Sequence, residues 1–184
     1  MDSFYTTEEL NKLGLKHLGK NVLISRKCSI YGAENISLGN NVRIDDFCIL
    51  SGNIEIGSYV HISAYNVLYG SGGILISDFS GISARSTLYS AIDDFSGEYM
   101  ISPLIPDEYR NVKSGKIILE KYVQIGANSI IMPEVCAKEG SVCGAFSFVN
   151  NDLEEWTINV GIPAKFLKKR SKNILNLSKE INND

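Results

Sequence analysis

Two histidines are the side chains of this sequence best suited to move a proton at neutral pH. His61 lies between Val60 and Ile62, and inward positions for both aliphatic neighbours would point its imidazole outward. An outward His61 is either a general base or an ordinary surface histidine, and the sequence leaves both interpretations open. His17 follows a predicted short helix and is interpreted as a surface imidazole.

A cluster of acids is the second group that could handle a proton. Asp93, Asp94 and Glu98 fall within six residues of one another. Carboxylates can fix an ammonium group and receive the proton that it sheds, although a solvated acidic loop has the same composition. Ser83 and Arg85 precede the cluster, and arginine is well suited to clamp a diphosphate. We therefore predict proton transfer at Asp93 and Glu98, and substrate contacts at Asp94, Ser83 and Arg85.

The elements that must position these residues follow from a six-residue period in the aliphatic side chains. Six residues form one short strand and a turn, and three such strands close a triangular coil with the repeated aliphatics inside. The period therefore predicts a parallel β-helix. Its in-frame positions are Ile24, Ile30, Ile36, Leu38, Ile44, Leu50, Ile56, Ile62, Leu68, Ile76, Ile82, Leu88, Leu119, Ile125, Ile131, Ala137, Cys143 and Val149.

Two segments depart from the period. Thr6 and Glu9 form a capping-box pattern and Gly14 provides a stop, which predicts a short N-terminal helix over the open end of the coil. In residues 92–116 the period vanishes, and two glycines and two prolines exclude a regular element, which predicts a long extruded loop. The expected organisation is a capping region at 1–20, β-helix at 21–91, the loop at 92–116, β-helix at 117–153, and a tail at 154–184.

The sequence has 184 residues, a net charge of −3 and 44% hydrophobic residues. This length and composition are typical of one soluble domain. No apolar run reaches membrane-spanning length and the first residues do not resemble a signal peptide, so a cytoplasmic location without membrane insertion is expected. The four cysteines have no CxxC spacing and are interpreted as free thiols, most of them buried.

The repeat, the loop and the C-terminal motif resemble the left-handed β-helix acyltransferases that use acetyl-CoA. Trp156, four residues, then Gly161, Pro163, Ala164 and Lys165 match the terminal signature of that family, and the resemblance covers about residues 20–172. Within it, residues 61–98 are similar to the N-acyltransferases of dTDP-4-amino-4,6-dideoxyglucose. This resemblance implies acetyl transfer to the amino group of a nucleotide-linked sugar, for bacterial surface polysaccharide, by a homotrimer with active sites between subunits.

The resemblance also implies the cofactor-binding residues. Backbone amides near Ala127 and Ala145 are expected to contact the pantetheine chain. Pro163, Lys165, Lys168 and Arg170 are expected to lie beside the phosphates of CoA. A solvated tail would have the same charges. On a net-acidic protein these few positive charges are only a weak indication of nucleic-acid binding, so no nucleic-acid partner is expected.

Other functions remain as alternatives. O-acetyltransferases of the galactoside and maltose type have an SxHD motif at the loop entrance, where this sequence has "SAIDDF" and no histidine. O-acetylation is therefore the second choice, because a hydroxyl needs a stronger base than an amine. A zinc hydratase with the same coil would need three histidines, and no metal site is predicted. A non-catalytic β-helix scaffold is the third class.

Overall fold

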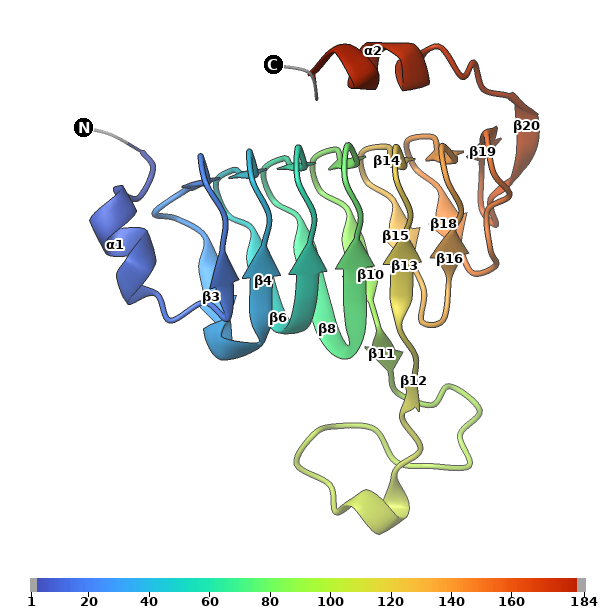
Figure 1. Ribbon diagram of the computed structural model, residues 1–184. Coiled ribbons are helices and arrows are strands. Elements are labelled where there is room, and N and C mark those ends of the chain that lie inside the picture. The colour runs from blue at the N-terminus through green and yellow to red at the C-terminus, as the bar shows by residue number, and fades with distance from the viewer. Residues whose placement is uncertain (1–2, 182–184) are drawn as a thin grey trace.

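The computed structural model describes residues 3–181 and shows a parallel β-helix, with one loop projecting from its side (Figure 1). Residues 1–2 and 182–184, the outer ends of the predicted capping and tail regions, lie outside the described residues. The predicted in-frame aliphatics form the core: Leu38, Ile44 and Leu50, for example, are fully buried. Ile30, in the first coil, is only partly buried. The six-residue period therefore predicted both the fold and most of its core.

Three faces make up each coil, because strands of successive coils stack in parallel register. The first face is formed by β2 (Leu23–Ile24), β5 (Arg43–Ile44), β7 (His61–Ile62), β9 (Gly81–Ile82), β14 (Gln124–Ile125), β17 (Val142–Cys143) and β19 (Thr157–Val160). Along this face the second residue of each two-residue strand points inward and the first points outward.

The long strands β6 (Ile49–Ile56) and β8 (Val67–Ile76) run through both remaining faces. The second face contains their first halves with β3 (Ser29–Tyr31), β10 (Thr87–Tyr89), β15 (Ile130–Ile131) and β18 (Phe148–Val149). The third face contains their second halves with β1 (His17–Leu18), β4 (Ile36–Leu38), β13 (Ile117–Leu119) and β16 (Cys136–Ala137).

An aromatic ladder lies at the corner that leads into the first face. Tyr59, Phe79, Tyr122 and Trp156 adopt left-handed φ values there. Consecutive ring centroids are 4.9, 5.5 and 6.1 Å apart. A left-handed φ is unfavourable for residues with a side chain, and aromatic stacking at about 0.5–1.5 kcal/mol per pair offsets that cost.

A polar ladder inside the coil connects successive turns. The side-chain oxygen Oδ1 of Asn66 accepts from the amide of Ser86, the Ser86 hydroxyl from the amide of Ser129, and the Ser129 hydroxyl from the amide of Ser147. The Ser147 hydroxyl accepts from the amide of Gly161 at 3.1 Å. Each hydroxyl thus satisfies a backbone N–H of the next coil, and the ladder ends at the C-terminal signature.

The N-terminal helix α1 (Thr7–Lys12) lies at the open end of the coil, as predicted (Figure 1). Both hydrogen bonds of the capping box between Thr6 and Glu9 are present. Leu10 is buried against the first coil, and the 3-10 helix η1 (Ala33–Asn35) joins β3 to β4. The four cysteines are free thiols, and three of them are buried.

The C-terminal region is more ordered than the tail that the sequence predicted. The strand β20 (Lys165–Lys169) pairs antiparallel with β19, and the helix α2 (Ile174–Ile181) runs back over the coil (Figure 1). The Ser178 hydroxyl on α2 lies 2.9 Å from the Tyr122 hydroxyl. Among residues 3–181, no helix is long and apolar enough to cross a membrane.

The loop predicted at 92–116 leaves the coil between the second and third faces. Its neck is an antiparallel pair of β11 (Ala91–Ile92) and β12 (Lys113–Ser114), and its tip contains the 3-10 helix η2 (Asp107–Tyr109). We call residues 91–114 the excursion. The prediction that this segment has no regular element was therefore wrong at its neck and at η2.

Candidate functional site

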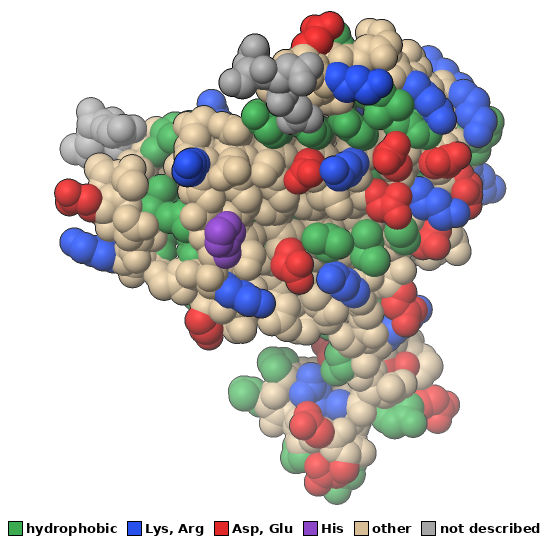
Figure 2. Space-filling model, viewed as in Figure 1, with side chains coloured by type: hydrophobic (Ala, Val, Ile, Leu, Met, Phe, Trp, Pro, Cys, Tyr) green, Lys and Arg blue, Asp and Glu red, His purple; other side chains and the backbone are tan. Residues whose placement is uncertain are grey.

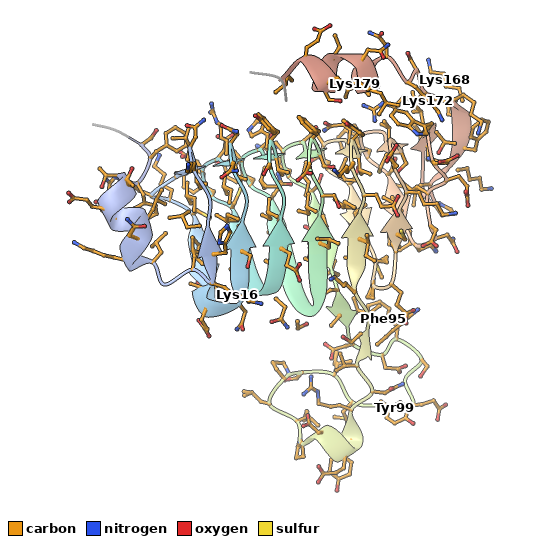
Figure 3. The ribbon with its side chains drawn as sticks, viewed as in Figure 1. Lys16, Phe95, Tyr99, Lys168, Lys172 and Lys179 are labelled. Carbon is orange, nitrogen blue, oxygen red and sulfur yellow. The ribbon has the colours of Figure 1, made fainter. Side chains whose placement is uncertain are left out.

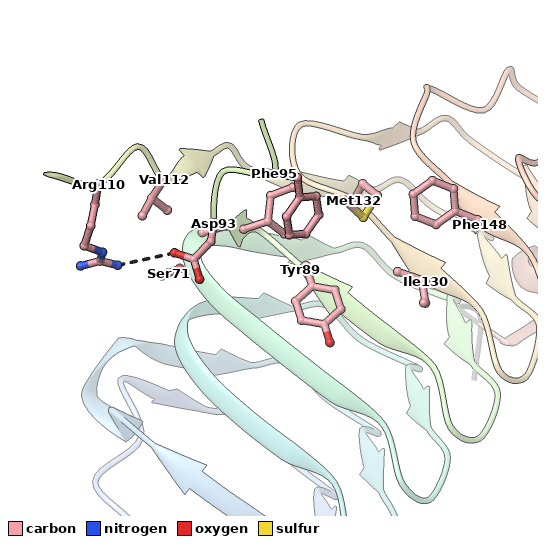
Figure 4. Close-up of a pocket in the computed structure, with 11 residues that line it drawn as sticks. Ser71, Tyr89, Asp93, Phe95, Arg110, Val112, Ile130, Met132 and Phe148 are labelled. Atoms are coloured by element: carbon pink, nitrogen blue, oxygen red, sulfur yellow. Dashed lines mark ion pairs between the residues drawn. The ribbon is translucent and has the colours of Figure 1, made fainter. Parts of the chain in front are cut away.

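A pocket of about 610 Å³ lies between the neck of the excursion and the second face (Figure 4). We call it the excursion pocket. Its lining residues come from β8, β10, the excursion and the last coils. They are Ser71, Tyr89, Ala91, Ile92, Asp93, Phe95, Arg110, Val112, Ile130, Met132 and Phe148.

Asp93 is the carboxylate of the predicted acidic cluster that lines this pocket. Its Oδ1 lies 3.8 Å from Nη2 of Arg110, and Nη1 of Arg110 donates to Asp107 Oδ1 at 3.2 Å. Arg110 Nε is buried and has no hydrogen-bond partner among the described residues. The pocket thus contains a carboxylate and a guanidinium.

Asp94 and Glu98 are placed differently from Asp93. Asp94 accepts hydrogen bonds of 2.9 and 2.5 Å from the amide and hydroxyl of Ser96, which close a local turn. Glu98 is exposed, and its amide donates to the Ser96 hydroxyl. The structure therefore brings one of the three predicted acids into the lining of the pocket and leaves the other two outside it.

His61 points outward from β7, as predicted, and lies in a groove on the first face. This groove of about 220 Å³, which we call the His61 groove, is also lined by Ser83 and Gln124. Gln124 Nε2 donates to the Ser83 hydroxyl at 3.1 Å. Gly81 stacks directly on His61 and presents no side chain there. The predicted residues His61 and Ser83 therefore share one site, and Asp93 lines another.

Asp45 holds the His61 ring from the neighbouring coil. Its two carboxylate oxygens lie 2.7 Å from His61 Nε2 and 2.7 Å from Arg43 Nε. Burial alone would raise the pKa of Asp45, but the hydrogen bonds from Arg43 and His61 outweigh it and hold that pKa below its usual range. Asp45 is therefore ionised at neutral pH.

Arg85 belongs to a stack at the corner between the first and second faces. Its guanidinium lies over the Tyr65 ring, 5.4 Å from the centroid, and Tyr65 stacks on Phe47 at 4.9 Å. Arg85 is not among the residues that line the excursion pocket.

The residues predicted to bind CoA lie at the C-terminal end of the coil. Lys165 and Lys168 are exposed on β20, and Lys and Arg side chains gather over β20 and α2 (Figures 2 and 3). Pro163 is exposed in the turn between β19 and β20. Ala127 and Ala145 lie in stacked corner turns, where the Ala127 carbonyl accepts from the amide of Phe146.

Arg170 has structural partners. Its Nη1 donates to the backbone carbonyls of Tyr122 and Gly140 at 2.6 and 3.0 Å. Burial lowers the pKa of this arginine below its usual value. Through Nη1 the guanidinium thus ties the end of β20 to the coil, and the predicted contact of Arg170 with a CoA phosphate stays a prediction.

Sequence reasoning missed Asp45 and Arg110. Asp45 lies on the coil before His61, and the stacking of Arg43 on His61 is a signal that could have found it. Arg110 lies in the excursion, where no period relates one residue to another. In the described part of the chain, no group of three or more His, Cys, Asp or Glu is placed to hold a metal ion.

The six-residue β-helix and the matches below define this protein as a hexapeptide-repeat transferase. The family model "Bacterial transferase hexapeptide (six repeats)" matches residues 35–70. The chain belongs to the acyltransferase family that includes the dTDP-4-amino-4,6-dideoxy-D-glucose acyltransferase of Escherichia coli. It is 48% identical to that relative over 172 residues, which are 92% of this chain and 90% of the relative.

Solved structures give the same result. The chain is 54% identical to AntD, an N-acyltransferase from Bacillus cereus. One structure is a serine mutant of AntD in complex with dTDP-4-amino-4,6-dideoxyglucose and coenzyme A, with a TM-score of 0.98 and coverage of 100% of this chain and 99% of that one. Another is AntD in complex with dTDP and 3-hydroxybutyryl-CoA, with a TM-score of 0.97 and coverage of 100% and 98%. A hexapeptide-repeat acetyltransferase from Vibrio cholerae, 22% identical with a TM-score of 0.59 and coverage of 90% and 80%, shares the fold.

Proposed function

We propose that this chain transfers an acyl group from an acyl-CoA to the amino group of a nucleotide-linked 4-amino-4,6-dideoxy sugar of the dTDP-glucose type. The observation that carries the proposal is the full-length similarity to acyltransferases of that substrate, combined with a carboxylate, Asp93, in a pocket beside the excursion. Acetyl-CoA, the donor expected from the sequence, is the smallest member of this donor class.

In the proposed reaction, a C–N bond forms between the sugar amine and the thioester carbonyl carbon, and the C–S bond breaks. The amine gives up a proton, and the departing thiolate takes one to become the free thiol. Asp93 holds the ammonium group and receives its proton, because a carboxylate suffices for an amine whose pKa is near solution pH. No covalent intermediate on the enzyme is needed.

His61 is the second proposed proton acceptor, and Ser83 a proposed acceptor contact beside it. Within one chain the His61 groove and the excursion pocket are separate. We therefore propose the homotrimer expected from the sequence, in which the groove of one copy faces the excursion of the next and the two form one site. Arg85 then contributes to binding of the acceptor diphosphate.

The donor is proposed to lie along the C-terminal end of the coil. Lys165 and Lys168 hold its phosphates, and the turns at Ala127, Ala145 and Pro163 accommodate the pantetheine chain. Asp94 and Glu98 have no contact with the excursion pocket, so we assign them to the shape of the excursion. A cytoplasmic location and a role in bacterial surface polysaccharide biosynthesis agree with a nucleotide-sugar acceptor and a CoA donor.

The test is to follow free thiol release from acetyl-CoA with dTDP-4-amino-4,6-dideoxyglucose, with the matching 4-hydroxy sugar nucleotide, and with simple galactosides. Release that needs the 4-amino sugar supports the proposal. Release with the hydroxyl acceptors and not with the amine would make the chain an O-acetyltransferase. Failure of the protein to bind immobilised CoA would make it a scaffold.

A further inference from the structure

The excursion pocket has two chemically different ends, as Figure 4 shows. At one end Asp93 and Arg110 form an ion pair. At the other end Ile130, Met132 and Phe148 form an apolar wall. A molecule that fills the whole pocket therefore presents a polar or basic group to Asp93 and an apolar group to this wall.

Two side chains of the apolar wall, Ile130 and Phe148, point away from the core, whereas Met132 packs against the core and also lines the pocket. Ile130 and Phe148 are register partners on adjacent coils, and both precede an inward-facing buried residue. Outward positions of a β-helix meet solvent unless something covers them. Ile130 is an apolar residue at such a position, and it is 40% exposed. Apolar side chains gathered in an open pocket are typical of a ligand site.

The same wall is joined to the turn between β19 and β20, where the signature residues lie. The amide of Phe148 donates to the carbonyl of Gly161 at 3.0 Å, and the amide of Ala164 donates to the carbonyl of Phe148 at 2.8 Å. The backbone of Phe148 thus holds the turn proposed to accompany the donor, and its side chain lines the pocket. A thioester reaching from this turn toward Asp93 passes the apolar wall.

We propose that the apolar end of the excursion pocket holds the acyl chain of the donor, and that Ile130 and Met132 determine the acyl chain length. This inference rests on the proposed function and deepens it by naming the donor class: acyl groups longer than acetyl. Each additional methylene buried against the wall raises kcat/KM by about fourfold. Butyryl-CoA is then preferred over acetyl-CoA by about 15-fold.

The experiment measures kcat/KM for acetyl-, propionyl- and butyryl-CoA at saturating dTDP-4-amino-4,6-dideoxyglucose, in the parent enzyme and in Ile130→Phe. The larger ring fills the apolar end, so the butyryl-to-acetyl ratio is expected to fall from about 15 to about 1. Ile49→Phe is the matched control, because Ile49 occupies the same outward column three coils away. Its ratio is expected to equal that of the parent.

Other outcomes overturn the inference in distinguishable ways. A parent enzyme that prefers acetyl-CoA, or a ratio that Ile130→Phe leaves unchanged, removes the acyl chain from this wall while acyl transfer itself stands. A higher KM for the sugar nucleotide with an unchanged donor ratio places the acceptor at the apolar end. Transfer from none of the three donors overturns the proposed function together with the inference.

Discussion

The Nε2 atom of His61 lies 2.7 Å from Oδ2 of Asp45, across two adjacent coils of the first face. A carboxylate at this distance accepts a hydrogen bond, so Nε2 is the ring nitrogen that donates to Asp45, and a proton from an amine would have to go to Nδ1. Arg43 donates to the other oxygen of Asp45 and fixes the carboxylate in turn.

His61→Asn is expected to lower turnover by about 10²-fold or more, because asparagine cannot accept the proton of the amine. Asp45→Asn is expected to lower turnover less, since the base remains but its orientation is lost. Steady-state turnover at saturating donor and acceptor measures both. If both variants stay within a few-fold of the parent, His61 is not the base and the Asp93 carboxylate acts alone.

Asp93 and Glu98 provide a comparison within one loop. Asp93→Asn is expected to lower kcat/KM for the amino sugar by about 10²-fold or more, because the neutral amide neither attracts an ammonium group nor takes its proton. Glu98→Gln makes the same chemical change on an exposed side chain outside the pocket and is expected to leave kcat/KM unchanged. Equal losses in the two variants would contradict the placement of the acceptor at Asp93.

The sequence was sufficient for the coil because its signal is periodic. Inward positions recur every six residues, so Leu38, Ile44 and Leu50 could be placed in the core without any knowledge of their neighbours in space. The capping box of α1 is equally local, and it was predicted residue by residue. Local and periodic patterns can be read from a sequence because each residue's partner lies at a known spacing.

The site was only partly predictable for the opposite reason. The ion pair of Asp93 with Arg110 depends on how an irregular excursion folds back on itself, and no spacing encodes that. The basic run at the C-terminus was predicted to be a charged tail. Arg170 in fact donates to two backbone carbonyls, and the residues after it form α2. Charge at a chain end is shared by ligand sites and by helix or strand ends, and tertiary contacts decide between them.

The C-terminal cations are expected to separate into two groups. Replacing Lys165 and Lys168 by Ala should raise the KM for acyl-CoA several-fold and leave the KM for the sugar nucleotide and the thermal midpoint unchanged, because both side chains are exposed. Arg170→Ala should instead lower stability by about 2–3 kcal/mol, since two backbone carbonyls lose a charged donor. A parental KM for acyl-CoA in the double variant would make those lysines a solvated surface.

Acid should weaken the N-terminal cap before it unfolds the coil. Hydrogen bonds from Arg26 and from the Thr6 amide lower the pKa of Glu9 from its usual 4.5 to about 2. A carboxyl group with a depressed pKa in the folded state contributes stability above pH 4.5, and that contribution is lost as the pH falls from about 4.5 to about 2. The thermal midpoint of Glu9→Gln should therefore fall less over this interval than that of the parent. Parallel midpoint curves for the two proteins would contradict this role of Glu9.

Ser147 is expected to link stability to donor binding, because its hydroxyl is the last member of the polar ladder and accepts from the amide of Gly161. Ser147→Ala leaves that part-buried amide without its partner, which should cost about 1 kcal/mol in the free energy of unfolding. Ser129→Ala removes the preceding member and leaves the buried amide of Ser147 unpaired, so its cost should be at least as large. The two variants should differ in the KM for acyl-CoA, which rises in Ser147→Ala because the signature turn loses a fixed point, and stays parental in Ser129→Ala. Denaturant unfolding and donor titration together measure this. An equal donor KM in both variants would mean that the contacts of Phe148 alone hold the turn.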